Sequence, residues 1–424
     1  MAEQFDAIVI GAGEAGVAHA ARMAASGKRV ALIEAGPPGE TWLDEAGIAT
    51  RALAESARAI WTARHAGRFG VTLAGPVGLD MRAVRNRKTR LVQGAGAALA
   101  ERLGGLKHLT RLQGQARFVA PNGIMVGKRL LGAPEILLDI GTRPRMPNWP
   151  GLDSVSHLTP ATISALDSLP GHLIVVGASA AGLEFAQIQA RFGAKVSVIE
   201  AGPHPLAGED EEVASLMRTA LEADGVSFLF NTTVDAVDWA GHGVLASLRS
   251  GRRLASIEGT HLLLAPEPVP MAEGLDLAAA GIAVDEAGFV IVDADGHTGA
   301  AGVRALGPGT VGGAFACNRV MTDPAFIRLG MTTAQLRRAG RPLKVAMRKD
   351  GEKDQPAECI RLLADAGTGA LLGASLLGPE AAVLAAALRP FILSGAAPDP
   401  AALLLPARLE ARLSRLLSGF SPLK

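Results

Sequence analysis

One sequence pattern occurs twice in this chain, and it limits the fold more than any other feature. Residues 5–37 contain an apolar strand, glycines in G-x-G-x-x-G spacing, a small-residue helix, a second strand and an acid. Residues 173–203 repeat that order, and a shift of 166 positions carries Gly11 onto Gly177. Each copy has the pattern of a dinucleotide-binding βαβ unit. Two copies at one offset predict two such domains and two bound nucleotides.

The first copy supplies candidate ligands for the phosphates and ribose of a dinucleotide. Gly11 permits the tight turn, Gly13 lets the backbone approach a pyrophosphate, and Gly16 lets the helix pack closely on the strand. The helix N-terminus offers unpaired N–H groups and a partial positive charge, and Glu34 is placed to accept hydrogen bonds from an adenosine ribose. A glycine-rich turn in an unrelated α/β fold is the alternative. Three neighbours complete this candidate set: Ala12, Ala15 and Ala35.

The second copy keeps most of the pattern and changes one glycine. Gly177 and Gly182 match the first and third glycines, whereas Ser179 replaces the second. Serine is small and can donate a hydrogen bond, so we expect it to be tolerated beside Ala181. Glu200 favours a free ribose 2′-hydroxyl and repels a 2′-phosphate, which predicts NADH in preference to NADPH. Two nucleotides held by one chain indicate electron or hydride transfer between them.

Composition places the chain among globular proteins and excludes several partners. The chain has 424 residues, of which 49% are hydrophobic and 20% charged, with a net charge of +1. No long run of one charge sign points to nucleic acid or an anionic membrane. The apolar runs are alanine-rich and broken by Gly or Pro, so we expect no transmembrane span. Because a strand begins so close to residue 1, we expect no signal peptide. The two cysteines cannot build a disulfide framework, which favours the cytoplasm.

The segment that follows Glu34 resembles a known redox motif. This stretch is similar to the frame G-G-T-C-x-x-x-x-C-x-x-x-K of the pyridine nucleotide–disulfide oxidoreductase family. That family includes dihydrolipoamide dehydrogenase and mercuric reductase. Trp42 and Gly47 stand at the two cysteine positions, and Arg51 stands at the lysine that lies near flavin N5 in the family. The resemblance therefore implies FAD bound without a redox-active dithiol. The positions that fit the frame are Gly39, Thr41, Leu43, Ile48, Ala52 and Leu53.

Further segments extend the resemblance to flavin and nicotinamide contacts. The resemblance implies that Ala116 passes the adenine and that Gly141 belongs to the family's A-T-G-A-R-P-R turn, in which Asp139 and Ile140 depart from the pattern. Ala265 fits the corresponding segment of the second domain. Gly307 is kept, but Pro308 replaces the family's aspartate for the flavin ribityl chain. Only 14 positions separate Pro308 from Thr322, too few for the helix that follows in the family.

The resemblance also implies a catalytic ion pair. Glu184 matches the family's glutamate that pairs with the lysine near N5, so Arg51 and Glu184 would keep the same arrangement of charges. An ordinary interdomain salt bridge is the alternative. Near the C-terminus, Leu405 replaces the histidine of the family's H-P-x-x-x-E pair, whereas Pro406 and Glu410 are kept.

These patterns predict an α/β protein with two Rossmann-like domains and a C-terminal α+β dimerisation domain. We expect an FAD-binding domain at 1–150, an NAD-binding domain at 151–266, a shortened returning segment at 267–320 and the dimerisation domain at 321–424. The apolar stretches 368–393 and 406–417, with Leu413, are the expected dimer contacts. The dimer is either a homodimer or a heterodimer with a related reductase.

Three functions remain open at this point. The first is an FAD-dependent enzyme that passes hydride from NADH to a non-disulfide acceptor. The second is a catalytically inactive subunit that acts through nucleotide binding or dimerisation. The third is a structural relic with filled pockets. Disulfide reduction requires a dithiol beside the flavin and an acid for the leaving thiolate, and Trp42, Gly47 and Leu405 supply neither.

Overall fold

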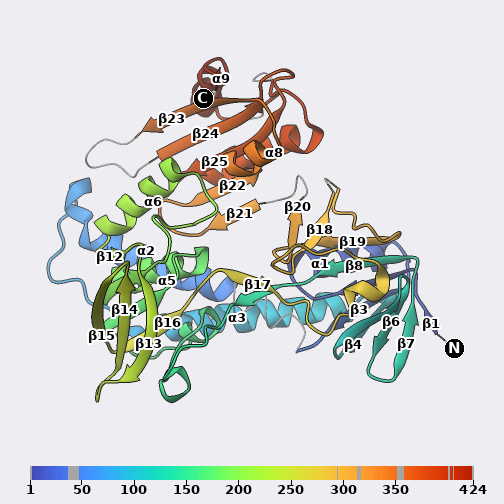
Figure 1. The fold of residues 1–424 in the computed structure, drawn as a ribbon, viewed down its shortest axis with the longest axis horizontal. Helices are drawn as coiled ribbons and strands as arrows, with labels where there is room; N and C mark the ends of the chain where they lie inside the picture. The colour runs from blue at the N-terminus through green and yellow to red at the C-terminus, as the bar shows by residue number, and fades with distance from the viewer. Residues whose placement is uncertain are drawn as a thin grey trace. The chain divides into compact units, whose positions relative to one another are not determined.

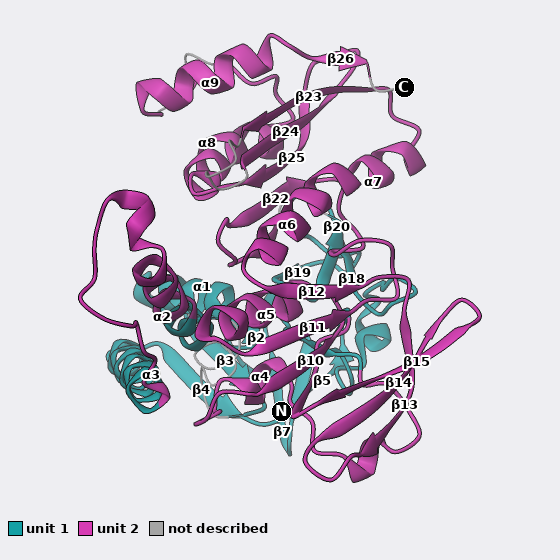
Figure 2. Ribbon diagram, turned by 90° about the vertical axis from the view of Figure 1, so that its left-hand side faces the viewer, with its two compact units in different colours: residues 1–53, 82–145, 267–313 teal, residues 54–81, 146–266, 314–424 magenta. Residues whose placement is uncertain are grey.

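The computed structural model describes residues 2–36, 47–293, 295–312, 317–350, 358–399, 402–403 and 405–422. The chain divides into two compact units, each assembled from three separate stretches (Figure 2). Unit 1 contains residues 1–53, 82–145 and 267–313, and unit 2 contains residues 54–81, 146–266 and 314–424.

The first unit is built on a parallel five-stranded sheet. Its strand order is β19-β8-β2-β3-β4, and every neighbouring pair is parallel. The sequence AIVI of β2 is buried at all four positions, as expected for a central strand covered on both faces. Helix α1 (Glu14–Ala25) connects β2 to β3 and turns Val17, Ala20 and Ala24 toward the sheet. The strand bounds are Ala7–Ile10 for β2, Val30–Glu34 for β3, Leu109–Gln113 for β4, Glu135–Asp139 for β8 and Val303–Leu306 for β19.

A smaller sheet closes one apolar core of unit 1. Its order is β1-β7-β6-β5, and Phe118, Ile124 and Leu131 share a buried cluster with Ile8 and Ile136 of the main sheet. Two short pairs, β9 with β17 and β18 with β20, complete the unit. The bounds are Glu3–Gln4 (β1), Ala116–Ala120 (β5), Gly123–Val126 (β6), Arg129–Gly132 (β7), Thr142–Pro144 (β9), Pro268–Pro270 (β17), Val290–Val292 (β18) and Thr310–Gly312 (β20).

Two helices contribute residues to both units. Helix α2 (Ile48–Arg64) belongs to unit 1 up to Leu53 and to unit 2 from Ala54, and α3 (Met81–Gly104) enters unit 1 at Arg82. No helix in the described part of the chain is both long and apolar enough to cross a membrane.

The second unit repeats the parallel arrangement. Its sheet has the order β12-β11-β10-β16, and α5 (Ala180–Phe192) connects β10 to β11 as α1 connects β2 to β3. An antiparallel sheet, β13-β14-β15, shares an apolar cluster with this sheet. The bounds are His172–Val176 (β10), Lys195–Ile199 (β11), Val226–Leu229 (β12), Thr233–Trp239 (β13), Val244–Ser250 (β14), Arg253–Gly259 (β15), His261–Leu264 (β16), Pro160–Ile163 (α4) and Glu211–Ala223 (α6).

The C-terminal part of unit 2 is an antiparallel sheet with helices (Figure 1, orange to red). Its strand order is β21-β22-β25-β24-β23-β26, and α8 (Ala381–Ser394) contacts β22 and β25. Leu413 of α9 (Ala407–Leu417) is fully buried in the core of this sheet, so it is not available as the dimer contact that we expected. The remaining bounds are Cys317–Val320 (β21), Phe326–Gly330 (β22), Thr333–Arg338 (α7), Leu343–Asp350 (β23), Glu358–Asp365 (β24), Leu371–Leu377 (β25) and Ser421–Pro422 (β26).

The predicted α/β class, with two glycine-turn units and a C-terminal α+β part, is confirmed. Both βαβ units form at the expected places, and the expected strand, turn and helix after residue 368 form as β25 and α8. After Pro308 the described residues form strand β20 and no helix, as the short spacing predicts. The four predicted domain boundaries remain predictions.

Candidate nucleotide-binding site

The first glycine turn lies at the carboxyl edge of the parallel sheet of unit 1. Gly11 has φ of +99°, and its N–H donates to the carbonyl of Ile33 at 2.8 Å. A Cβ at Gly11 would collide with the backbone of Asp139, so only glycine fits there. Gly13 is the N-cap of α1 and has extended backbone without side-chain capping. The start of α1 therefore keeps the geometry that a helix uses to bind an anion. Ala12 is buried beneath this turn, and Ala15 is half-buried in the first turn of the helix.

A carboxylate from the neighbouring strand reaches into this turn. Oδ2 of Asp139, the last residue of β8, accepts the N–H of Gly16 at 2.6 Å. A Cβ at Gly13 would lie 2.6 Å from the same oxygen, and Gly307, with φ of +85°, faces Oδ1. Burial raises the pKa of Asp139 to about 6; the Gly16 bond lowers it and the charge of Glu14 raises it.

The sequence indicated Asp139 only as a departure from the family pattern and assigned it no role. The available signal was a charged residue at the carboxyl end of a buried strand that pairs with the strand before the turn. The structure adds that this side chain, Gly13, Gly16 and Gly307 meet at one place.

The end of β3 lines an open pocket. A cavity of about 210 Å³ is lined by Leu32, Glu34, Arg111, Leu112 and Gln113. Leu112 and Gln113 also line a second cavity of about 480 Å³ that extends toward Gly114 and Gly274. A carboxylate beside a pocket is the group that binds a ribose hydroxyl.

The structure describes some of the other residues that were predicted to contact the flavin, and the rest lie outside the described residues. Ala35 is exposed next to Glu34, and Ala116 is buried at the start of β5. Gly141 follows β8, and its carbonyl accepts the N–H of Met271 at 2.9 Å. Three predicted contacts lie outside the described residues: Gly39, Thr41 and Trp42.

The second glycine turn, in unit 2, repeats the first with one exchange. Gly177 has φ of +103°, and its N–H donates to the carbonyl of Ile199 at 2.9 Å. The Ser179 hydroxyl points inward: it donates to the carbonyl of Ala265 at 2.7 Å and accepts the N–H of Gly182 at 3.3 Å. The serine therefore caps α5 from within the turn. Ala181 is half-buried in the first turn of the helix.

Glu200 is held rigidly beside this second turn. Its Oε2 accepts the N–H of Ala178 and its Oε1 accepts the N–H of Gly202, both at 2.7 Å. These two bonds fix a negative charge at the end of β11, next to the glycine turn. Each oxygen keeps acceptor capacity for a ribose hydroxyl.

The predicted catalytic pair is divided between the units. Glu184, in α5 of unit 2, accepts the N–H of Met321 at 2.6 Å. Burial raises its pKa to about 7, whereas the Met321 bond and the charge of Arg319 lower it. Arg51 is exposed on α2 in unit 1. The ion pair between Arg51 and Glu184 therefore stays a prediction.

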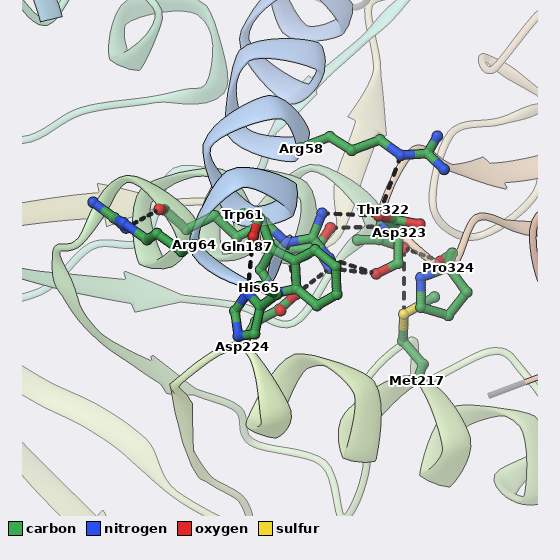
Figure 3. Close-up of polar contacts among 11 residues, drawn as sticks. Arg58, Trp61, Arg64, His65, Gln187, Met217, Asp224, Thr322, Asp323 and Pro324 are labelled. Carbon is green, nitrogen blue, oxygen red and sulfur yellow. Dashed lines mark hydrogen bonds and ion pairs between the residues drawn. The ribbon is translucent and has the colours of Figure 1, made fainter. Parts of the chain in front are cut away.

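A buried polar network in unit 2 joins α2, α5 and residues 322–324 (Figure 3). Arg191 donates to Asp224 at 2.9 Å and to the carboxylate of Asp323 at 3.0 Å. Gln187 exchanges hydrogen bonds with the backbone of Asp323, at 2.8 Å in each direction. The Trp61 ring of α2 covers the Arg191 guanidinium, 5.0 Å from its centroid. Sequence reasoning missed this network because bonded members such as Gln187 and Asp323 are 136 positions apart.

The described residues fit two adenine dinucleotides and show no metal centre. In unit 1 a positive-φ glycine, a helix start capped by Asp139 and a pocket beside Glu34 occur together, and unit 2 repeats the turn with Glu200. The described part of the chain contains no group of three His, Cys, Asp or Glu side chains that could hold a metal ion. Fold and site thus define the class of two-dinucleotide α/β proteins.

Comparison with known proteins identifies the family within that class. The chain belongs to the pyridine nucleotide-disulphide oxidoreductase family, whose model matches residues 5–322. Members of this family are FAD-dependent NAD(P)H oxidoreductases. The resemblance inferred from the motifs is therefore confirmed.

Individual relatives match over nearly their full length. A dihydrolipoyl dehydrogenase of Thermus scotoductus is 30% identical over 416 residues, covering 90% of this chain and 89% of the relative. A mercuric reductase of Streptomyces lividans is 28% identical, covering 89% and 87%. The solved structure of the HOCl-induced flavoprotein disulfide reductase RclA of Escherichia coli has a TM-score of 0.75 at 24% identity, covering 98% of this chain and 99% of RclA. The RclA likeness supports the fold alone.

Proposed function

We propose that this protein is an FAD-dependent oxidoreductase that passes hydride from NADH to an acceptor that is not a disulfide. The observation that carries the proposal is the placement of its cysteines. The chain has only Cys317 and Cys359, and neither stands at the family's dithiol positions, which hold Trp42 and Gly47. Cys359 is buried in β24, and burial raises the pKa of its thiol to about 11. Such a thiol is a poor nucleophile near neutral pH.

The first turn and its pocket are proposed to hold FAD, which supplies hydride-accepting chemistry when bound. The start of α1 would receive the diphosphate, and Glu34 would receive the adenosine ribose. Ala116 would lie along the adenine, as the resemblance implies. Gly39, Thr41, Trp42, Gly141 and Gly307 complete the proposed flavin contacts.

The second turn is proposed to hold NADH. The start of α5, with Ser179 as an internal cap, would receive the diphosphate. The fixed charge of Glu200 would accept a ribose hydroxyl and repel the 2′-phosphate of NADPH. Ala265 supports the turn from the end of β16.

Arg51 and Glu184 are the proposed catalytic residues. The proposed role of Arg51 is to supply the positive charge of its guanidinium group. Glu184, with a pKa near 7, can hold or release a proton at its carboxyl group near neutral pH. The Met321 bond fixes its orientation.

An absorbance experiment tests this function. Purified protein mixed with FAD and passed through a desalting column should keep a flavin spectrum. Anaerobic NADH should bleach that spectrum, and NADPH should do so far more slowly. Glu200→Gln keeps an acceptor oxygen but removes the charge, and it should reduce the difference between the two nucleotides. Flavin that binds but ignores both nucleotides would contradict the proposal.

A second candidate function is a catalytically inactive subunit that dimerises with itself or with a related reductase. The Asp139 carboxylate inside the first turn favours it, because it places an anion beside the proposed diphosphate position. Pro308 at the family's aspartate position points the same way. Protein that is colourless after incubation with excess FAD and desalting, under every condition tried, would support this candidate.

A further inference from the structure

The two glycine turns satisfy the same backbone amide in different ways. The N–H of the third glycine bonds a side-chain oxygen in both units: Asp139 at 2.6 Å from Gly16, and Ser179 at 3.3 Å from Gly182. In unit 1 the oxygen comes from the strand beside the turn, whereas in unit 2 it comes from the helix N-cap itself.

The side chains that fill the space beside each turn differ between the two units, just as the capping groups do. Asp139 and Ala265 occupy equivalent places, since the backbone of each would collide with a Cβ on the first glycine of its turn. A Cβ at Gly13 would lie 2.6 Å from Asp139 Oδ2, so an aspartate at 139 requires glycine at 13. In unit 2 the small Ala265 leaves room for Ser179, whose hydroxyl bonds the Ala265 carbonyl. The residue at position 13 and the residue at position 139 therefore depend on each other, and the same holds for positions 179 and 265.

The exchange changes the charge of the turn. The cap in unit 2 is a neutral hydroxyl, whereas the cap in unit 1 is a buried carboxyl group. Among the described residues, Glu14 in the first turn of α1 is the ionisable neighbour that raises its pKa. Glu34 ends β3, two strands from β8, and the turn after β19 carries no ionisable side chain from Gly307 to Thr310.

The remaining ionisable groups on the packed elements contact partners other than Asp139. On α1, His19 lies 3.5 Å from Glu135, the first residue of β8, and Arg22 contacts His19. On β19, Arg304 donates to the carbonyl of Asp295 at 2.8 Å. No described cation therefore bonds the Asp139 carboxyl group.

We propose that dinucleotide binding at the first turn takes up a proton on Asp139, so that this residue makes FAD affinity depend on pH. The proposal rests on FAD binding at this turn, as proposed above. An ionised Asp139 and a diphosphate would both be anions at one helix start, and the protonated carboxyl group removes that repulsion. The cap of the second turn is the Ser179 hydroxyl, which does not ionise in this pH range.

The direction of the effect follows from linkage. Burial already raises the pKa of Asp139 to about 6, and a bound diphosphate would raise it further. Above pH 6 the free protein holds an ionised Asp139 and the complex a protonated one. The dissociation constant should therefore rise about tenfold per pH unit until the pKa of the complex is reached.

The test is a titration of FAD at constant ionic strength from pH 5.5 to 8. Quenching of flavin fluorescence gives the dissociation constant, and calorimetry in buffers of different ionisation enthalpy gives the protons taken up. The wild-type protein should bind FAD with an affinity that falls steeply as pH rises, and it should take up close to one proton on binding at pH 7. Asp139→Asn keeps an oxygen for the Gly16 amide, and it should bind FAD tightly at every pH with no proton uptake.

Two further variants separate the carboxyl group from general effects. Gly13→Ser combined with Asp139→Ala copies the second turn into the first, and this double variant should fold and also lose the pH dependence. Glu14→Gln removes the other acid at the start of α1, and it should keep the steep wild-type dependence.

The outcomes distinguish this inference from the proposed function. Tight FAD binding by wild type that does not change with pH overturns the inference and leaves the function standing. Equal pH dependence in wild type and Asp139→Asn does the same. If neither protein, nor the double variant, binds FAD at any pH, both the inference and the proposed function fail.

Discussion

The carboxylate of Glu184 accepts the backbone N–H of Met321 at 2.6 Å, which ties α5 to the residue that follows β21. A buried carboxyl group in this position carries a cost when it ionises. Burial raises its pKa from 4.5 to about 7, even though the Met321 bond and Arg319 act in the opposite direction. This contact has a consequence for stability as well as for chemistry.

We expect Glu184→Gln to change the pH dependence of folding. A folded-state pKa above the unfolded value stabilises the protein fully below pH 4.5, and this contribution is lost as pH rises through 7. The loss amounts to at most about 3 kcal/mol in the free energy of unfolding. Glutamine still accepts the Met321 bond but does not ionise. Urea unfolding should therefore show a variant that is more stable than wild type at pH 8 and similar to it at pH 5. A wild-type advantage at pH 8 would contradict the assignment.

Cys359 should be unreactive in the native protein. Its pKa near 11 leaves about one thiolate in ten thousand at pH 7, and the side chain is buried in β24. In a Cys317→Ser background, a chromogenic disulfide reagent should label Cys359 within minutes only after denaturation.

Neither this variant nor the wild-type protein should show NADH-dependent turnover of lipoamide, glutathione disulfide or Hg(II). Turnover of any of these three by pure wild-type protein would refute the absence of disulfide reductase activity.

Helix α8 offers a better test of dimerisation than α9. An open apolar groove of about 730 Å³ runs along α8 and includes Val383, which is 47% exposed. If this face forms the proposed dimer, Val383→Asp should convert a dimer to a folded monomer by light scattering, with circular dichroism unchanged. Leu413→Asp should instead destabilise the C-terminal domain by several kcal/mol, because it buries a charge in the core. A Val383→Asp protein that remains dimeric at micromolar concentration places the interface elsewhere.

The Arg191 network should contribute measurably to stability. Arg191 and Asp224 are both about 95% buried, so Asp224→Asn leaves part of a buried charge without its partner. We expect a cost of about 3 kcal/mol in the free energy of unfolding. Glu222→Gln is the matched control, because it breaks the exposed Arg218–Glu222 pair near the C-terminal end of α6. That control should cost less than about 0.5 kcal/mol. Equal effects of the two changes would show that burial does not strengthen the network.

Sequence reasoning recovered the features that depend on local spacing. The strand Ala7–Ile10, the helix that starts at Glu14 and the acid at Glu34 follow from apolar runs and glycine positions within about 30 residues. The same logic located the second βαβ unit, and it agrees with the strand, not a helix, that the described residues form directly after Pro308. Both turns could be predicted because their backbone conformation requires glycine at fixed positions.

Features that depend on distant residues were not recovered. Asp139 was seen as a departure, but its bond to Gly16 spans 123 positions, and no local pattern predicts it. The inward direction of the Ser179 hydroxyl was missed because its acceptor, Ala265, lies 86 positions away. The sequence predicts Leu413 at a dimer surface and the structure buries it, because an apolar stretch alone does not distinguish a core face from an interface.

The two caps also differ in when they can form during folding. Ser179 and Gly182 are three residues apart, so that cap can close as soon as the first turn of α5 appears. Gly16 must wait for a strand 123 residues farther along the chain. Closing so long a loop costs chain entropy before the bond contributes anything. The start of α1 is therefore completed late, and a chain interrupted before β8 has been made would carry its first nucleotide turn without a cap, whereas the second turn carries its own.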